Sequence, residues 1–514
     1  MMKDKIVTKE QFAEIRKEIK QQGKRIVLCH GVFDLLHLGH VEHFLDAKKC
    51  GDILVVSVTA ARYVNKGPGR PFFNDQQRLQ FLSQIEAVDY CMLSEAVTVH
   101  DIIRYVQPDV YAKGSEYQTA ENDLTGNIGS EEDIVREYGG TVYYTKGDVY
   151  SSSKLLNHYF SALPPKVLET SIRLKEKYGQ DLMQQIRNRM EAFRDIKILV
   201  VGDVILDEYV FCNVQGLTMK DASLSTFYDY EERYTGGALA IAKHVANFSD
   251  HVTYCSMIGT EQGVRDYIYA NMGSVKLEII EDEHFTTPVK RRFLKENPHR
   301  QEFDKLFSIN HLMKRGEKKR FDYRAFHEKL NELTSQFDMV IVGDFGHGLI
   351  DAKAIEILEN KSNYLAVNCQ SNSANMGTNL ITKYGRADSF VLDERELRLA
   401  FGQELSRREE LLQKLKEQLK GQCVWVTVGA EGAIGMQKDF LVHEPALTLS
   451  VKDTIGAGDA FYSLASLCAY KELPVEISTL IANAAGALKT GVLGNKESVK
   501  KVDLLKFVNT VLNV

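Results

Sequence analysis

Residues 451–470 read VKDTIGAGDAFYSLASLCAY, a glycine-rich turn that leads into a helical pattern beginning near Ala457. A Gly-Ala-Gly turn at a helix N-terminus presents free backbone N–H groups to an anion. An aspartate beside that turn can accept a proton from a hydroxyl that attacks phosphorus. A lone G-x-G is usually only a tight turn. The whole D-T-I-G-A-G-D string is much more specific than a lone G-x-G.

The sequence upstream of this turn alternates between buried strands and helical or turn-rich segments. Short apolar runs of this kind are typical of parallel strands covered on both faces. They predict one large α/β domain over residues 195–514. Residues 214–234 interrupt the alternation with β-branched and aromatic residues, and we expect a small antiparallel β flap there. The expected strands are IKILVVGDVILDEY (196–209), MVIVGDF (339–345), YLAVNC (364–369), SFVLD (389–393) and CVWVTVG (423–429).

A second chemical pattern, GVFDLLHLGH at residues 31–40, follows a buried strand and opens a helix. His37 and His40 are three residues apart, so both can face one ligand. The free N–H groups of the helix start favour phosphate, and Gly39 lets that phosphate approach the backbone. A metal site or two buried histidines are the alternatives.

The surrounding sequence predicts a parallel, doubly wound, Rossmann-like sheet, with domain boundaries at residues 1–160. A helix is expected over SSKLLNHYF (152–160). Pro164 and Pro165 then interrupt the chain, and residues 161–194 are expected to form a helical linker with one long polar helix from Lys166 to about Arg194.

Composition narrows the functional class. The 514 residues carry a formal net charge of −6, with 44% hydrophobic and 26% charged residues, which is ordinary for a globular protein of two or three domains. The charge argues against a nucleic-acid surface, and neither a membrane span nor a secretory signal is expected. Eight cysteines without metal-ligand spacing favour a reducing cytoplasm.

The 451–470 stretch resembles the second signature of the PfkB/ribokinase family of small-molecule kinases, and other stretches agree along most of residues 195–505. The resemblance implies that Asp459 is the general base and that Gly456, Ala457 and Gly458 form the oxyanion hole. It implies sugar contacts at Asp207, Gly236 and Gly237. Separately, the basic stretch TTPVKRR (286–292) places Lys290, Arg291 and Arg292 where they can reach a substrate phosphate, and a solvated basic edge is the alternative. The residues implied to contact ATP are Thr427, Gly429, Gly432 and Asn483, and those implied to contact Mg²⁺ are Glu396 and Asp393, where Asp393 replaces the family's Asn.

Three departures from that family lie around the sugar and the phosphate. Ala240 and His244 stand where the first signature often has Asn. VNCQSNSANMG (367–377) stands where heptose kinases have a D-P-K stretch. These changes leave the sugar open, and a degenerate kinase is the alternative.

Residues 25–158 resemble the nucleotidyltransferases with an HxGH motif, which include cytidylyltransferases. The resemblance implies that His37 and His40 hold the nucleotide phosphates and that Lys66 neutralises the α-phosphate. It places Ser151, Ser152 and Ser153 at the β- and γ-phosphates. The further nucleotide contacts that it implies are Gly31, Phe33, Gly39, Arg70 and Lys113, with a solvated surface cation as the alternative for Arg70 and Lys113.

Together, the two halves resemble the bifunctional ADP-heptose synthases with the domain order reversed. The resemblance implies a kinase that makes a sugar 1-phosphate and a nucleotidyltransferase that makes an NDP-sugar for a surface glycan such as lipopolysaccharide. ATP and Mg²⁺ are expected at the kinase site, and ATP or CTP at the other. The alternatives are a CDP-polyol or CDP-sugar pathway, and one half acting as a ligand sensor. A homodimer through the flap is expected, with no nucleic-acid or membrane partner.

Overall fold

The computed structural model describes residues 5–64, 71–96, 98–114, 128–146, 164–221, 223–297, 302–313, 322–372, 375–402, 406–447 and 451–513. The chain forms two compact units, one of residues 1–171 with 505–514 and one of residues 172–504. Each unit is described by itself. Among the described residues, no helix has both the length and the apolar character needed to cross a bilayer.

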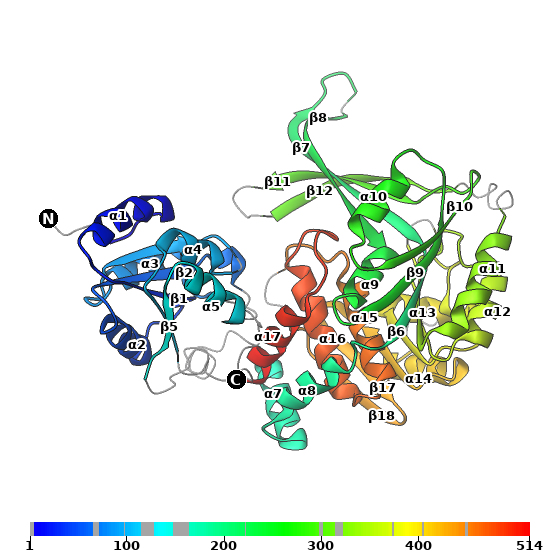
Figure 1. The fold of residues 1–514 in the computed structure, drawn as a ribbon. Coiled ribbons are helices and arrows are strands. Elements are labelled where there is room, and N and C mark those ends of the chain that lie inside the picture. Colours follow the sequence, from blue (N-terminus) through cyan, green and yellow to red (C-terminus); the bar gives the residue numbers. More distant parts are fainter. Residues whose placement is uncertain are drawn as a thin grey trace. The chain divides into compact units, whose positions relative to one another are not determined.

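The first unit contains a five-stranded parallel sheet in the order β3-β2-β1-β4-β5, as the alternating pattern predicts (Figure 1). Its strands are β1 Ile26–Gly31, β2 Ile53–Thr59, β3 Tyr90–Ser94, β4 Val110–Lys113 and β5 Thr141–Tyr144. Its helices are α1 Lys9–Gln21, α2 Leu38–Lys48, η1 Ala61–Tyr63, α3 Asp75–Ser83, α4 His100–Val106 and α5 Ile128–Glu137.

Both faces of this sheet are buried because successive strand residues point to opposite sides. Ile26 and Leu28 of β1 pack with α1, α4 and α5, whereas Val27 and Cys29 pack with α2 and α3. Helix α5 was not predicted from the sequence. The helix expected at residues 152–160 lies outside the described residues.

The single long helix expected at residues 166–194 is wrong. Helix α7 (Pro165–Tyr178) and helix α8 (Leu182–Glu191) are separated at Gly179, whose φ of +95° is a conformation that other residues rarely adopt. Within the second unit, Lys177 and Tyr178 bond to Glu476, which ties the end of α7 to helix α16 (Val475–Thr490).

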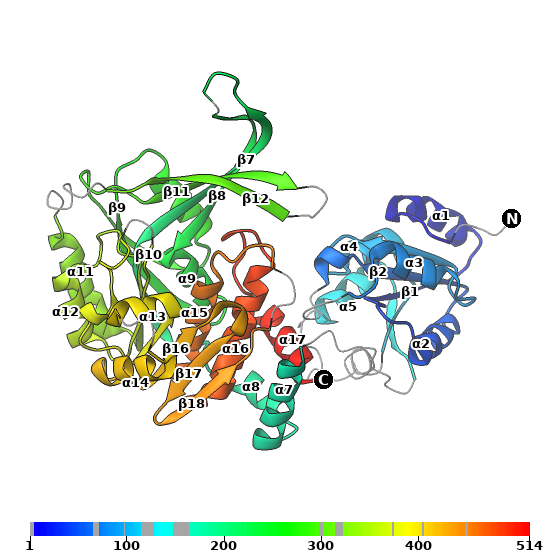
Figure 2. The ribbon, with the colours of Figure 1, turned by 180° about the vertical axis from the view of Figure 1, so that it is seen from behind.

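The second unit contains a nine-stranded sheet in the order β10-β9-β6-β13-β14-β15-β16-β17-β18, parallel from β10 to β16 and antiparallel at β17 and β18 (Figure 2). The strands are β6 Lys197–Gly202, β9 His251–Ile258, β10 Lys276–Glu281, β13 Met339–Asp344, β14 Leu365–Cys369, β15 Ser389–Asp393, β16 Cys423–Thr427, β17 Ala433–Gln437 and β18 Phe440–Glu444.

Helices cover both faces of this sheet. One face carries a large apolar core with α11 Arg324–Leu333, α12 Ala352–Lys361, α13 Glu394–Phe401 and α14 Arg408–Gln418. Helices α9 Ala238–Val245, α15 Ala457–Tyr470 and α16 pack on the other face, where the Tyr462 hydroxyl donates to the carbonyl of Val342 in β13. The remaining elements are α10 Val264–Asn271, η5 Thr334–Gln336, η6 Ile381–Lys383, η7 Gly429–Glu431 and α17 Lys501–Leu512.

The expected flap is larger than residues 214–234. Strands β7 (Val204–Leu217) and β8 (Leu224–Gly237) form a long antiparallel hairpin, and β11 (Val289–Asn297) and β12 (Glu302–His311) extend it to a four-stranded sheet. In Figure 1 the tip of the β7–β8 hairpin projects beyond the β11–β12 pair. The base of β7 begins two residues after β6, so the flap carries Asp207 to the ends of the parallel strands.

Candidate active sites

The glycine-rich turn of the second unit has the backbone geometry of an anion site. Gly456 precedes α15 with a φ of +81°, and a Cβ there would lie 2.5 Å from Asn495 Oδ1. A Cβ at Gly458 would meet no atom within 4 Å, so space is open beside it. The Ala457 amide donates to the Thr454 carbonyl at 3.3 Å. The next two amides, those of Gly458 and Asp459, lie in the first turn of α15, where a helix itself supplies no carbonyl partner. The turn therefore places Gly456, Ala457 and Gly458 at the start of α15, and their role as an oxyanion hole stays a prediction.

Asp459 is buried in the first turn of α15. Its Oδ1 accepts a hydrogen bond from Gln370 Nε2 at 2.7 Å, and its Oδ2 has no hydrogen-bond partner among the described residues. Burial raises the pKa of Asp459 to about 6, against the hydrogen bond from Gln370, which lowers it. A carboxylate with this pKa is ionised at neutral pH and still basic enough to take a hydroxyl proton.

Asp207 lies on β7 and faces the same site. Arg292 Nη1 contacts its Oδ1 at 2.5 Å, and Asn495 Nδ2 donates to its Oδ2 at 3.0 Å. A Cβ at Gly236 would overlap Asp207 Oδ2, so only glycine fits there. Gly237, with a φ of +60°, precedes α9. The structure therefore brings together three residues that the sequence predicted near the sugar.

Lys290 lies between the two carboxylates. It makes no hydrogen bond or ion pair among the described residues, and the charges of Asp207 and Asp459 both act on its ammonium. Burial lowers the pKa of Lys290, and those charges oppose the shift. Its neighbours on β11 differ, because Arg291 pairs with Glu231 and Arg292 with Asp207. Lys290 thus differs from Arg291 and Arg292 in having no carboxylate partner among the described residues, and its contact with a substrate stays a prediction.

Asp393 and Glu396 form the capping box of α13. Asp393 Oδ1 accepts from the Glu396 amide, and Glu396 Oε2 accepts from the Asp393 amide. Glu396 Oε1 accepts from the Ser371 amide, and burial raises the pKa of Glu396. Across the described ranges, no group of three or more His, Cys, Asp or Glu residues gathers as metal ligands. These carboxylates do not form a magnesium site by themselves, and their metal role stays a prediction.

The residues predicted at the nucleotide divide into two places. Thr427 ends β16 beside Asp393 of β15. Gly432 and Asn483 both meet residues 444–446: a Cβ at Gly432 would overlap that backbone, and Asn483 Nδ2 donates to the Pro445 carbonyl at 3.1 Å. Gly429 has a φ of +53° in the turn between β16 and β17. Their contacts with a nucleotide stay predictions.

In the first unit, the turn after β1 brings Gly31 and Phe33 together. Phe33 has a φ of +47°, unusual for a residue with a side chain, and its ring would be 2.9 Å from a Cβ at Gly31. The same ring packs edge-on against His40, with 5.4 Å between ring centroids. Asp34 fixes the facing loop, because its carboxylate accepts the amides of Phe72 and Phe73. A role for Asp34 was not predicted from the sequence.

The two histidines lie together, as their spacing predicts. His37 is the N-cap of α2, its amide donates to His40 Nδ1 at 3.4 Å, and the ring centroids are 3.9 Å apart. Partial burial lowers the pKa of His37. Gly39 lies between them in the first turn of α2. The arrangement gives two imidazoles and a helix N-terminus at one point, as an anion site requires.

Lys113 ends β4 and pairs with Glu131 of α5, a partner that the sequence did not suggest. Its role at a nucleotide stays a prediction. Five other predicted residues, Lys66, Arg70, Ser151, Ser152 and Ser153, lie outside the described residues.

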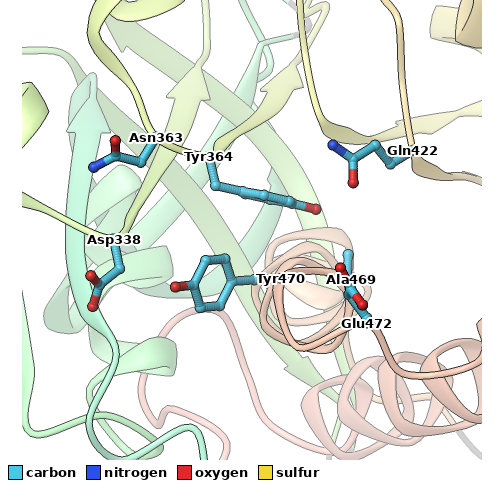
Figure 3. Close-up of a pocket in the computed structure, with 7 residues that line it drawn as sticks. All are labelled: Asp338, Asn363, Tyr364, Gln422, Ala469, Tyr470 and Glu472. Carbon is cyan, nitrogen blue, oxygen red and sulfur yellow. The ribbon is translucent and has the colours of Figure 1, made fainter.

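A separate pocket of about 340 Å³ lies at the amino-terminal ends of β13, β14 and β16 in the large sheet (Figure 3). Tyr364 and Tyr470 meet there edge to face, with Asp338, Asn363 and Gln422 around them. Tyr470 ends α15 and Asp459 begins it, so at 1.5 Å per residue the pocket lies about 16 Å along the helix from the candidate base. It takes no part in that site.

Two known families match separate parts of the chain. Residues 195–501 match the family described as pfkB family carbohydrate kinase, and residues 28–158 match the one described as cytidylyltransferase-like. Among solved structures, Escherichia coli phosphofructokinase-2 in complex with substrates and products gives a TM-score of 0.49 at 15% identity, over 61% of this chain and 99% of that one. Arabidopsis thaliana ribokinase complexed with ribose and ATP gives a TM-score of 0.47 at 15% identity, over 61% of this chain and 99% of that one.

Curated relatives match a shorter part of the chain. The protein called bifunctional protein HldE from Wolinella succinogenes is 37% identical over 120 residues, 23% of this chain and 25% of that protein. The protein of the same name from Methylobacillus flagellatus is 42% identical over 125 residues, 24% of this chain and 24% of that protein. The chain thus spans about a quarter of the length of these relatives.

Proposed function

Because this chain belongs to the pfkB family of carbohydrate kinases and also carries a cytidylyltransferase-like domain, we propose that it catalyses two consecutive transfers to one sugar. The kinase domain phosphorylates the sugar to a sugar 1-phosphate, and the other domain converts that product to an NDP-sugar. The observation that carries the first step is the buried Asp459, which lies beside an open glycine turn and faces the ammonium of Lys290.

In the kinase step, the sugar hydroxyl gives its proton to Asp459 Oδ2 as its oxygen attacks the γ-phosphorus of ATP. The bond from that phosphorus to the ADP oxygen breaks, and ADP leaves. Negative charge on the transferring group meets the first-turn amides of Gly458 and Asp459 in α15. Asp207 and the backbone at Gly236 hold the sugar, and Lys290 binds a phosphate or hydroxyl on it. The nucleotide enters as its Mg²⁺ complex, the ordinary form for such transfers.

In the nucleotidyl step, a phosphate oxygen of the sugar 1-phosphate attacks the α-phosphorus of ATP or CTP, and pyrophosphate leaves. No protein nucleophile is needed, because His37, His40 and the start of α2 stabilise the charge that gathers on the phosphate oxygens. Removing one such donor costs about 10²–10³ in rate. The product is an activated sugar of the ADP-heptose type, which would feed a surface glycan.

The substrate test uses the whole chain. We would incubate it with ATP or CTP and a panel of sugar phosphates and alditols, and follow ADP, pyrophosphate and product mass. A sugar that yields ADP first and pyrophosphate second, with an NDP-sugar mass at the end, supports the proposal. Binding of nucleotide without either product, across the panel, contradicts it and favours the sensor alternative.

We also propose a homodimer through the flap. Its strands expose large apolar side chains, which a free surface sheet rarely does. These are Leu217, Met219, Leu224, Phe227, Tyr228, Tyr230, Phe307 and Ile309. A second copy of the flap would cover them. Light scattering should give twice the mass of the chain, and Phe227→Glu should halve it; a monomeric wild type contradicts the proposal.

The working compartment is proposed to be the cytoplasm. All eight cysteines are unpaired in the structure, and seven of them are buried. Free buried thiols of this kind fit a reducing environment.

A further inference from the structure

The side-chain amide of Gln370 joins the candidate base to the large sheet. Its Nε2 donates to Asp459 Oδ1 at 2.7 Å and to Asn368 Oδ1 at 2.8 Å. Asn368 in turn donates from Nδ2 to the carbonyl of Val391 on β15 at 2.8 Å. One N–H group of the Gln370 amide therefore donates to Asp459, and the other donates to Asn368 of β14.

The backbone of Gln370 is held as well. Gln370 follows the last residue of β14, its amide donates to the Asp344 carbonyl at 2.8 Å, and its own carbonyl accepts from Asn379 Nδ2 at 3.0 Å. A side chain held at both ends loses little further freedom when it bonds a carboxylate, which is what a preorganised site requires. Gln370 also lies in the stretch 367–377, where this chain departs from the heptose kinases.

We propose that Gln370 is a positioning residue for Asp459. This inference rests on the kinase function proposed above. The amide occupies Oδ1 and fixes the plane of the carboxylate, so Oδ2 is the oxygen left to take the hydroxyl proton. An amide N–H bonds better to a carboxylate than to a carboxylic acid, so the contact also keeps Asp459 ionised at neutral pH.

Other charged groups act on Asp459 from each neighbouring element. Asp207 of β7 and Glu396 of α13 favour its protonated form, whereas Lys290 of β11 and Lys489 of α16 favour its ionised form. Burial is the largest influence, and it raises the pKa. Among the described residues, Gln370 is the group that hydrogen-bonds to the carboxylate directly. Its removal should therefore shift the acid limb of the kinase reaction upward.

The test compares Gln370→Leu with the wild type in pH profiles of kcat/KM for ADP formation. We expect the acid limb to move to higher pH, with a loss of about 10- to 100-fold below neutral pH and a smaller loss above it, the size that a hydrogen bond to a charged group implies. Gln370→Glu, which puts a second carboxylate against Asp459, should move it further. An unchanged acid limb in folded Gln370→Leu overturns the inference.

The matched control is Gln422→Leu. Gln422 Nε2 also bonds an aspartate, Asp388, but at the amino-terminal ends of β15 and β16. Gln422 lines the pocket of Figure 3. The same change there should leave the pH profile as in the wild type. An equal shift in both variants would show a general effect of instability and would overturn the positioning role.

A second readout separates this inference from the kinase proposal. Difference infrared titration, with Asp459→Asn as the blank, reports protonation of the Asp459 carboxyl whether or not the enzyme turns over. A higher pKa of Asp459 in Gln370→Leu supports the contact even if no sugar is phosphorylated, in which case the kinase proposal alone fails. An unchanged pKa refutes the inference even in an active kinase.

Discussion

Gly236 and Asp207 lie on adjacent strands so closely that a Cβ on residue 236 would overlap the Oδ2 atom of Asp207. Asp207 cannot move away freely, because Arg292 and Asn495 hold its two oxygens. The glycine is therefore a condition for the carboxylate's position, and that position is where the sugar is proposed to bind.

Gly236→Ala should raise the KM for the sugar by at least 10-fold, because the added methyl group displaces Asp207 at a cost of about 1–3 kcal/mol. Steady-state kinetics of ADP formation measure this. Gly385→Ala is the control, since a Cβ there lies 3.6 Å from Glu359 in ordinary contact. Equal KM values for the wild type and Gly236→Ala would refute the assignment of Asp207 to the sugar.

Asp459 gives the kinase a pH dependence with a defined sign. Because its pKa is about 6, ADP formation should fall as the pH drops below about 6, where the protonated carboxyl can no longer accept a proton. Pyrophosphate release from supplied sugar 1-phosphate should not share that limb. Parallel pH profiles of the two products test this, and a common acid limb would contradict it.

Asp459, when ionised at neutral pH, should also lower the free energy of unfolding of the protein. A carboxyl whose pKa rises from 3.8 to about 6 on folding contributes stability below pH 4 that is lost as the pH rises to about 6. Asp459→Asn should therefore be more stable than the wild type above pH 6, by roughly 3 kcal/mol, and not below pH 4. Trp425 is the single tryptophan and is fully buried, so its fluorescence during denaturation reports this domain. A difference in the free energy of unfolding between Asp459→Asn and the wild type that persists at pH 4 would contradict this prediction.

Lys489 should give the kinase an alkaline limb. Its ammonium is buried in α16 and donates to the Gly494 carbonyl, and burial lowers its pKa to about 8. A Cβ on Gly456 would be 3.0 Å from Lys489 Cε, so the positive charge lies beside the anion site. Kinase activity should fall above about pH 8, and Lys489→Met should lower it already at pH 7. Lys496→Met, which removes a half-exposed cation paired with Glu232, is the control. It should change neither the alkaline limb nor the activity at pH 7.

Gly31→Ala should damage the nucleotidyltransferase site alone. The added methyl group would push the Phe33 ring, which packs on His40, out of place. Pyrophosphate release should fall at least 10-fold while ADP formation is unchanged. Gly129→Ala in α5, where a Cβ meets nothing within 4 Å, should leave both activities intact. Unaltered pyrophosphate release in Gly31→Ala would contradict the role of this turn.

The sequence predicted the parts of these sites that are local in the chain. The turn 453–459 and the motif 31–40 each carry their geometry within a few residues, because the glycines and the helix start are adjacent. Alternating apolar runs likewise predicted both parallel sheets. Helix α5 (Ile128–Glu137) was missed, although the strands on either side of it were predicted. The break at Gly179 was missed because a single glycine inside a polar pattern does not by itself end a helix.

Contacts between distant residues could not be read from the sequence. Gln370 reaches Asp459 across 89 residues, and Asn495 reaches Asp207 across 288. No periodicity encodes such pairs, because the order of strands in the sheet places them together. The departure of residues 367–377 from the heptose kinases was visible in the sequence. Gln370, within that stretch, was the available signal of a contact with the site.

The most direct test of two independent sites on one chain compares Asp459→Asn with His37→Ala. The account predicts that Asp459→Asn abolishes ADP production and retains pyrophosphate release from supplied sugar 1-phosphate, and that His37→Ala does the reverse. Loss of both products in either variant, with the protein still folded, would contradict it.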